Sequence, residues 1–390
     1  MAYAADLKSA AFGLGGSSPP APTSRMNVRD EIQIKERIMK NTIDELVASI
    51  ETPHLSFEDY LNTYADKVGA LINTYIPSGS HPDMNKYLYT PLKQYSKNGG
   101  KRHRPLISFA ACLAVGGEAA RATSAAAAIE HFHTAALIHD DIADEAELRR
   151  GEPCFHLKEG EGLAINAGDY ALSLVNSTVM FDPLLDDAMK LRVMTELVKM
   201  TQHTVEGQAL DIGWARDGRY DITVEDYLVM ATHKTAHYSG AVPLAIGAIV
   251  GFGSETEVEG LRNYGLDTGL AFQIQDDLLN LIGSEESAQK DFRNDITEGK
   301  RTLVVVHALQ NSSKAQRDRL VEILSSKEKN QEVLAEAVAI MEAAGSLDYA
   351  RNYAENLTGI AKNRLREIVQ PSPARDLLIS MADWFVNRLK

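Results

Sequence analysis

Residues 135–144 read Ala-Ala-Leu-Ile-His-Asp-Asp-Ile-Ala-Asp, and residues 272–280 read Phe-Gln-Ile-Gln-Asp-Asp-Leu-Leu-Asn. Each stretch places two adjacent aspartates after a run of largely apolar residues. In an α-helix, residues four apart differ by about 40° in azimuth and by roughly 6 Å along the axis, so Asp140 and Asp144 share a face. Like charges at that spacing repel, and the helix gains nothing from them unless a cation lies between.

The surrounding sequence is helical in pattern. Apolar residues recur at three- and four-residue intervals in four long segments: 30–51, 118–147, 184–211 and 258–283. Alternating β-branched runs are nearly absent, and no break between segments is long enough to be a flexible linker. We therefore predict one large all-α domain over residues 28–390. Residues 1–27, rich in Ala, Ser, Gly and Pro, are expected to be a disordered tail, with organelle targeting as the weaker alternative.

Composition excludes several classes of protein. The chain has 390 residues, with 40 Lys plus Arg against 54 Asp plus Glu, and its formal charge of −14 argues against a nucleic-acid binder. Two cysteines do not make a disulfide framework, which favours a reducing compartment such as the cytoplasm. The longest uncharged run, residues 235–254, contains a proline and four glycines, so we expect a buried helix and no transmembrane segment.

The two aspartate pairs favour divalent metal ions. Mg²⁺ is bound by one or two carboxylates, several waters and substrate phosphate oxygens. The alternative is that each pair only solvates a helix end. Two such clusters in one chain, each preceded by apolar helix, favour the metal site.

Short basic groups supply the complementary charge for an anionic substrate. Residues 99–105 read Gly-Gly-Lys-Arg-His-Arg-Pro, where the glycines allow a close backbone approach. Lys101 and Arg104 fall on one side if a helix begins there. Arg149 and Arg150 follow the first acidic stretch, and adjacent arginines in a turn can serve two different anions.

At these residues the chain closely resembles the trans-isoprenyl diphosphate synthases, or polyprenyl synthetases, over roughly residues 84–390. The motifs occur in the family's order: GGKRHRP, EHFHTAALIHDDIADEAELRRGEP, NAGDY, GQALDIGW, HKTAHYSG, FQIQDDLLN and KDFRNDITEGKRT. The resemblance implies a single helical bundle of the class I isoprenoid synthase type with a central cavity. It also implies condensation of isopentenyl diphosphate with an allylic diphosphate, and a homodimer.

The resemblance implies a role for each matching residue. Three Mg²⁺ ions are expected at the aspartate motifs, whose members are Asp140, Asp141, Asp144, Asp276 and Asp277. The residues expected to touch the allylic diphosphate are Arg149, Lys234 and Lys290. Those expected to bind the diphosphate of isopentenyl diphosphate are Lys101, Arg104, His133 and Arg150. Those expected at the reacting centre and its polar wall are Gln208, Asp211, Thr235, Phe272, Gln273, Asp295 and Lys300. His131 and His139 have no such support.

One position departs from the family pattern, because Asn280 stands where many members have an aspartate. The essential ligand in the family is the first aspartate of this motif. We therefore expect the change to be tolerated, which leaves the role of Asn280 open.

Product length depends in this family on the residues upstream of the first motif. Farnesyl-type enzymes usually carry a bulky aromatic at the fifth position before the first aspartate, where this chain has Ala135, followed by Ala136. We therefore expect a product longer than fifteen carbons, with geranylgeranyl diphosphate as the first choice. A deeper floor could come from Phe132, Leu174, Met180 or Phe181.

Other functions share some of the features of a geranylgeranyl diphosphate synthase. A longer-chain polyprenyl synthase or a farnesyl diphosphate synthase would use the same motifs. A class I terpene cyclase shares the helical fold but does not need the basic sites for a second diphosphate. A non-catalytic partner subunit would be expected to lack an aspartate motif.

Overall fold

The computed structural model describes residues 41, 44–46, 48–50, 55–282, 293–326 and 330–387, all of them in one compact unit spanning residues 41–390. The predicted tail, residues 1–27, and the predicted substrate ligand Lys290 lie outside the described residues.

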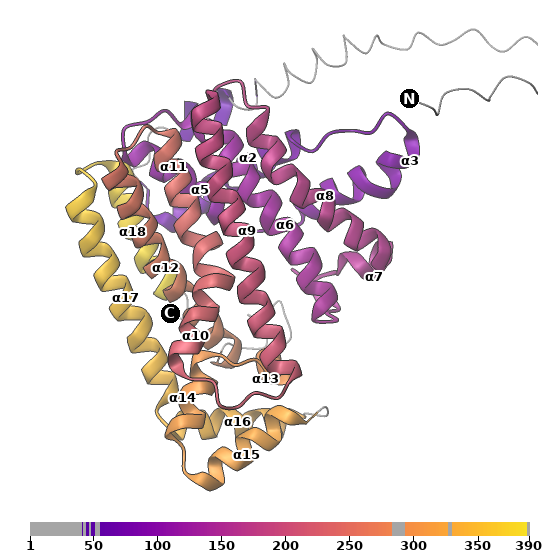
Figure 1. The fold of residues 1–390 in the computed structure, drawn as a ribbon, viewed down its shortest axis with the longest axis vertical. Coiled ribbons are helices and arrows are strands. Elements are labelled where there is room, and N and C mark those ends of the chain that lie inside the picture. Colours follow the sequence, from indigo (N-terminus) through magenta and orange to yellow (C-terminus); the bar gives the residue numbers. More distant parts are fainter. Residues whose placement is uncertain are drawn as a thin grey trace, which may run out of the picture. The chain divides into compact units, whose positions relative to one another are not determined.

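The described unit is helical, which confirms the predicted all-α fold (Figure 1). Its elements in chain order are α2 (Phe57–Thr74), α3 (Pro82–Met84), η1 (Asn85–Tyr89), α4 (Thr90–Lys97), α5 (His103–Ala114), η2 (Ala119–Ala122), α6 (Thr123–Ala143), β1 (Leu148–Arg149), β2 (Glu152–Pro153), α7 (Phe155–Glu159), α8 (Glu161–Met180), α9 (Asp187–Arg216), α10 (Val224–Ala231), η3 (Thr232–Ala241), α11 (Val242–Val250), α12 (Glu255–Ile282), α13 (Asn294–Thr297), α14 (Leu303–Asn311), α15 (Lys314–Ser325), α16 (Gln331–Ala343), α17 (Ser346–Ile368) and α18 (Pro373–Asn387). The two short strands form one antiparallel hairpin.

Helix α6 is buried on all sides over most of its length. Every residue from 123 to 135 is buried, and partly exposed residues begin at Ala136. The alanines at 125–128 favour a helix and are small enough for α5, α8 and α11 to pack closely around it. The apolar part of α6 is therefore fixed in the core, and its carboxylate-bearing end emerges from that core.

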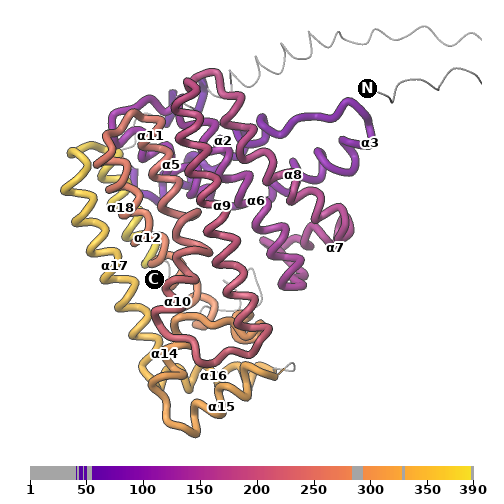
Figure 2. Tube along the Cα trace, in the orientation of Figure 1, coloured from indigo at the N-terminus to yellow at the C-terminus, as the bar shows by residue number. Residues whose placement is uncertain are grey.

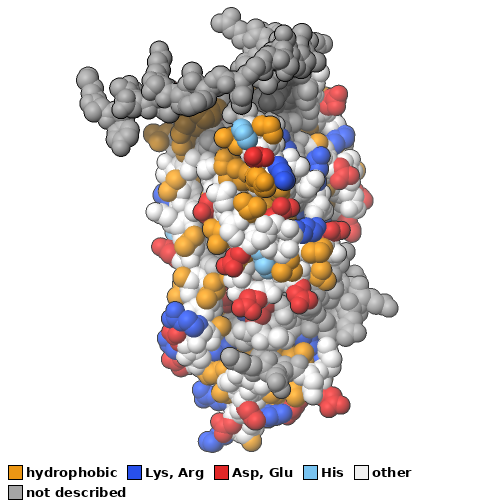
Figure 3. Space-filling model, turned by 90° about the vertical axis from the view of Figure 1, so that its right-hand side faces the viewer, with side chains coloured by type: hydrophobic (Ala, Val, Ile, Leu, Met, Phe, Trp, Pro, Cys, Tyr) orange, Lys and Arg blue, Asp and Glu red, His pale blue; other side chains and the backbone are white. Residues whose placement is uncertain are grey.

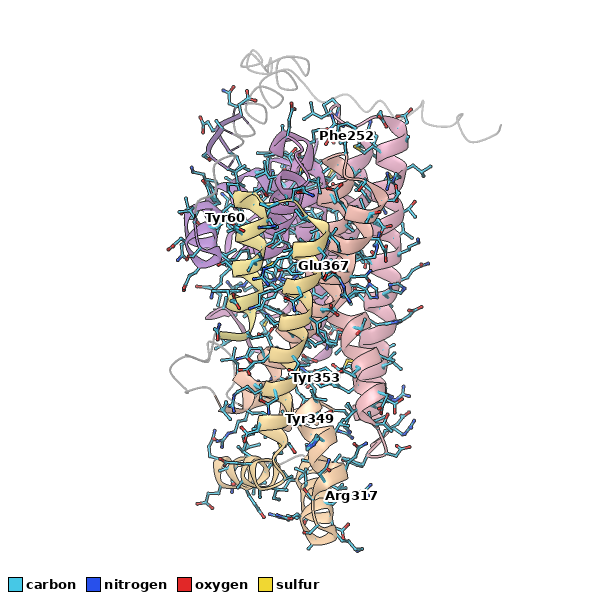
Figure 4. All side chains as sticks on the ribbon, turned by 90° about the vertical axis from the view of Figure 1, so that its left-hand side faces the viewer. Tyr60, Phe252, Arg317, Tyr349, Tyr353 and Glu367 are labelled. Atoms are coloured by element: carbon cyan, nitrogen blue, oxygen red, sulfur yellow. The ribbon has the colours of Figure 1, made fainter. Side chains whose placement is uncertain are left out.

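Helix α12 carries the second aspartate pair and packs against η3, α11, α17 and α18. The tube trace shows the long helix α17 running beside it (Figure 2). Tyr349 and Tyr353 lie in the first turns of α17 (Figure 4), and the Tyr349 ring stacks on His307 of α14 at 4.1 Å between centroids. This contact joins α17 to α14.

The element η3 is a ten-residue π-helix that approaches its neighbours backbone to backbone. A Cβ added at Gly265 of α12 would lie 2.6 Å from the Cα of Ala241, and one at Gly269 would lie 2.9 Å from the Cα of Ala236. On the other side, a Cβ at Gly207 of α9 would overlap the backbone nitrogen of Lys234. Glycine is required at these three positions because no side chain fits between the helices.

The uncharged run at residues 235–254 forms most of η3 and all of α11, and every residue of α11 is buried, as predicted. None of the helices in the described part of the chain combines the length and the apolar character needed to cross a bilayer.

The close approach at Gly207 leads to a stability prediction. Gly207→Ala should lower the free energy of unfolding by about 1–3 kcal/mol, because the added methyl group forces α9 and η3 apart. Urea unfolding followed by circular dichroism measures the change. The matched control is Gly213→Ala on the same helix, where a Cβ meets nothing within 4 Å; it should be neutral or stabilising by about 0.5–1 kcal/mol. Equal effects of the two substitutions would contradict the proposed overlap.

Candidate active site

The first aspartate motif lies at the C-terminal end of α6 and faces α9 and the segment after α12. Asp140 accepts a hydrogen bond from Nε2 of Gln208 at 3.0 Å, and its other oxygen lies 3.6 Å from Arg149. Asp144 caps the helix, and one of its oxygens lies 3.5 Å from Nζ of Lys300. Asp140 and Asp144 therefore each lie close to a basic side chain.

Asp141 has a different environment from its two neighbours. It is fully buried, and it accepts hydrogen bonds from the guanidinium of Arg149 and, at 3.3 Å, from the hydroxyl of Tyr95. Arg149 is on β1, so this ion pair ties the β1–β2 hairpin to α6. The Asp141 carboxylate raises the pKa of Arg149 against the opposing effect of burial.

The second motif is organised by a chain of hydrogen bonds from η3 to α12. Thr235 donates to Oε1 of Gln273 at 2.6 Å, and Nε2 of Gln273 donates to Asp277 at 2.7 Å. The hydroxyl of Tyr227 donates to the other Asp277 oxygen at 2.7 Å. Asp277 is buried, and burial together with the nearby Asp295 raises its pKa to about 8. Asp276, by contrast, is partly exposed.

Two lysines lie among these carboxylates. Lys234 of η3 donates to Asp211 of α9. Lys300 pairs with Glu298 and lies 3.6 Å from Asp295, in addition to its contact with Asp144. Burial opposes the charge on both ammonium groups, but the surrounding carboxylates outweigh it and raise both pKa values. Both lysines are thus held charged within the site.

Asn280 has a definite structural role. Its side-chain oxygen accepts a hydrogen bond from the backbone N–H of Asp295 at 3.2 Å, and its carbonyl accepts one from the backbone N–H of Arg293. A neutral amide at this position therefore fastens the segment that bears Asp295 to the end of α12.

Arg104 and His133 form the centre of a separate basic group. The Arg104 guanidinium contacts Nε2 of His133 at 3.2 Å and donates to the hydroxyls of Tyr238 and Ser239 on η3. Burial, and then the charge of Arg104, hold the pKa of His133 well below its usual range. A neutral His133 that accepts from Arg104 carries its proton on Nδ1. That buried atom has no hydrogen-bond partner among the described residues.

The two adjacent arginines point to different partners, as predicted. Arg150, unlike Arg149, donates to the carbonyls of Asn98 at 3.1 Å and Gly99 at 2.8 Å. A Cβ at Gly100 would lie 3.0 Å from this guanidinium, so the glycine loop and Arg150 fit each other closely. A pocket of about 260 Å³ between α4, the hairpin and α7 includes both arginines in its wall.

The prediction for the glycine loop needs a correction. Helix α5 begins at His103, so Lys101 precedes it and does not share a helix face with Arg104. Arg102, to which no role was assigned from the sequence, is buried in a left-handed conformation and ion-paired with Glu130 of α6. Both residues lie inside motifs quoted above, but the motifs are separate and nothing in the sequence indicates that these two residues form a pair.

The upstream alanines face different parts of the core. Ala135 is fully buried in a small apolar cluster between α4, α6 and α8 that includes Leu174, whereas Ala136 packs against the main core that contains Phe132. Met180 and Phe181 are 47% and 78% exposed. The expectation that these two side chains form a buried floor is therefore wrong, since they lie at the solvent-exposed end of α8.

The donor set at the two motifs fits Mg²⁺. Asp140, Asp144 and Asp276 offer partly exposed carboxylate oxygens, the ligands that this ion prefers. Within the described residues, no three acidic, histidine or cysteine side chains are close enough as they stand to enclose a metal. Carboxylates that do not enclose the ion suit Mg²⁺, because this ion keeps several waters and takes further oxygen ligands from substrate phosphates.

Over most of its length the chain is similar to known prenyl diphosphate synthases. The family model described as polyprenyl synthetase matches residues 85–341. A short-chain isoprenyl diphosphate synthase of Methanothermobacter thermautotrophicus is 42% identical over 290 residues, which are 74% of this chain and 87% of the relative. A geranylgeranyl diphosphate synthase of Saccharolobus solfataricus is 34% identical over 338 residues, 85% of this chain and 98% of the relative.

Solved structures give the same result. The crystal structure of a geranylgeranyl pyrophosphate synthetase from Pyrococcus horikoshii matches with a TM-score of 0.77 and 32% identity, covering 88% of this chain and 99% of that one. The fold and the site thus define a class of helical prenyltransferases. This chain belongs to the polyprenyl synthetase family, as its motifs indicated.

Proposed function

We propose that this protein is a Mg²⁺-dependent prenyltransferase that joins isopentenyl diphosphate head to tail to an allylic diphosphate, with trans geometry. The observation that carries the proposal is that two separate groups of charged and polar side chains lie along one helix. Asp140, with its lysine and arginine neighbours, lies at the end of α6, and His133 lies two turns earlier, about 10 Å along the axis. Two diphosphates can therefore be held with their hydrocarbon parts facing each other.

The first site suits the allylic diphosphate. Asp140, Asp144 and Asp276 would hold three Mg²⁺ ions, which when bound would neutralise charge on the departing diphosphate. Asp141 and Asp277, which were also predicted as metal ligands, are buried and already hydrogen-bonded, so we assign them to holding Arg149 and Gln273 in position instead. Arg149 and Lys234 add positive charge where the diphosphate leaves, which stabilises the transition state of ionisation. The predicted contribution of Lys290 completes this set; it lies outside the described residues.

The second site suits isopentenyl diphosphate. Arg104, Lys101 and Arg150 supply its positive charge, and the Nδ1–H of His133 supplies a neutral donor. Holding the second substrate converts the condensation into a step within one complex. The new carbon–carbon bond leaves a cation that loses a proton to restore the double bond, and the released pyrophosphate accepts this proton. No protein base is then needed.

The walls of the reacting centre come from η3 and α12. The Thr235–Gln273 hydrogen bond presents amide and hydroxyl dipoles, Gln208 holds Asp140, and the Phe272 ring provides an aromatic face. Asp211, Asp295 and Lys300 fix the positions of the charged groups around them. These residues would stabilise the cation while excluding water.

Incubation of the purified protein with isopentenyl diphosphate, Mg²⁺ and each allylic primer tests this function. Elongated diphosphates should form, and Asp140→Asn or Asp276→Asn should lower kcat by about 100-fold or more, because each removes charge that balances the metal ions. Glu147→Gln, an exposed acid near the first motif, is the matched control and should retain activity. No elongation with any primer, or release of a cyclic hydrocarbon, would overturn the proposal.

We propose a product longer than fifteen carbons, with geranylgeranyl diphosphate as the first choice. Ala135 supports this because its methyl group leaves the apolar cluster between α6 and α8 without a bulky side chain at that level. Leu174, in the same cluster, would form the next barrier for the growing chain.

Replacement of Ala135 by tyrosine should shorten the product, since the ring fills the space into which the chain extends. Chromatographic sizing of the products measures the effect. Ala135→Ser, which keeps the volume small, should leave product length unchanged. An unaltered product from Ala135→Tyr, in a variant that still folds and turns over, would count against this position as the floor.

We propose a homodimer as the functional assembly, located in a reducing compartment such as the cytoplasm. Helix α9 presents exposed apolar side chains seven residues apart, which is nearly two turns and places them along one face: Leu191, Val198, Val205 and Ile212. Hydrophobic side chains also gather on the face shown in Figure 3. Pairing with a second copy would bury such a row. Cys112 and Cys154 are both buried and do not form a disulfide with each other, which is compatible with a reducing environment.

Val205→Glu should convert the dimer to a monomer, because Val205 is 62% exposed at the centre of the row and a paired interface would bury the introduced charge without a partner. Sedimentation velocity measures the oligomeric state. Ile360→Glu on α17, where the side chain is 54% exposed, is the control and should leave the dimer intact. A wild-type monomer would refute the assembly.

A further inference from the structure

The C-terminal helix α18 ends in an aromatic cluster that reaches the site. Trp384 packs edge-on against Phe57 of α2 with 5.5 Å between centroids, and Phe385 packs against Phe272 of α12 at 4.8 Å. His103, the first residue of α5, lies 5.1 Å from the Phe272 ring. The cluster therefore joins α18 to the helix that follows the glycine loop and to the wall of the reacting centre.

One face of the Trp384 ring meets a lysine of the glycine loop. Nζ of Lys101 lies 4.7 Å from the ring centroid, within the range of a cation–π interaction. Lys101 itself is exposed and precedes α5, so no helix restrains it. The neighbouring acid on α18, Asp383, is paired with Lys362 at 2.6 Å. The indole therefore presents its face to Lys101 while the nearby carboxylate is engaged elsewhere.

We propose that Trp384 is a positioning residue for Lys101 at the diphosphate subsite of isopentenyl diphosphate, an inference that rests on the proposed function. A long lysine side chain has many rotamers, and part of that freedom is lost when the ammonium binds an anion. An indole face restricts the freedom before the substrate arrives. The ring contacts one side of the ammonium and can keep it in place while the remaining N–H groups bind a diphosphate.

The position of Trp384 implies an effect on one substrate only. Lys101 belongs to the same glycine-loop motif as Arg104, which is assigned above to isopentenyl diphosphate, and other residues are assigned to the allylic site. Loss of the indole should therefore raise the KM for isopentenyl diphosphate and leave the KM for the allylic substrate and kcat close to those of the wild type. A purely structural role for Trp384 would instead lower the stability or kcat without selecting one substrate.

Steady-state kinetics with Trp384→Leu and Trp384→Phe test the selectivity. The leucine variant should raise the KM for isopentenyl diphosphate about two- to fivefold, the range expected for losing a weak cation–π contact. The phenylalanine variant keeps a ring and should recover part of the loss. Unchanged KM values in a folded leucine variant would overturn the inference. An inactive wild-type protein would instead overturn the proposed function.

A fluorescence titration tests the same contact without turnover. The chain contains two tryptophans, so Trp214→Phe leaves Trp384 as the only indole emitter. Adding isopentenyl diphosphate alone should change its emission, because the bound diphosphate partly neutralises the charge of the ammonium over the ring. Lys101→Met in the same background should abolish that change. Emission that responds equally with and without Lys101, or that does not respond although the substrate binds by calorimetry, would refute the assignment.

Discussion

The approach of three helical backbones at η3 is the constraint on which the site depends. Glycines at 207, 265 and 269 let α9 and α12 come into contact with the main chain of η3. Lys234 and Thr235 are thereby brought within hydrogen-bonding distance of Asp211 on one side and Gln273 on the other. The π-helical winding of η3 widens each turn at this point, and such segments are frequent at functional sites.

Several buried ions of the site are compensated by an opposite charge. Asp141 is matched by Arg149, and Lys300 is surrounded by three carboxylates. An unpaired charge at this depth would be very costly. Removing one member of such a pair therefore affects more than a single contact, since its partner is left buried and uncompensated. Arg149 and Lys300 also lie close to Asp140 and Asp144, and so help to fix the directions of those carboxylates.

The sequence predicted much of the site because several of its residues lie within short motifs. Asp140 and Asp144 share a helix face by spacing alone, and the all-α fold follows from the periodicity of the long segments. The Arg102–Glu130 pair and the hydroxyl of Tyr227 on Asp277 could not be predicted in this way. Both contacts join residues far apart in sequence, and helix geometry relates only residues within one helix.

By itself the sequence determined the helical class, the two carboxylate motifs and the family to which the chain belongs. Only the tertiary structure decided which aspartates are exposed and which are buried. It also set the start of α5 after Lys101, and it exposed Met180 and Phe181. The physical reason is that burial depends on what packs against a helix from elsewhere in the chain. A local sequence pattern indicates which residues share a face of a helix, and only the fold determines what that face contacts.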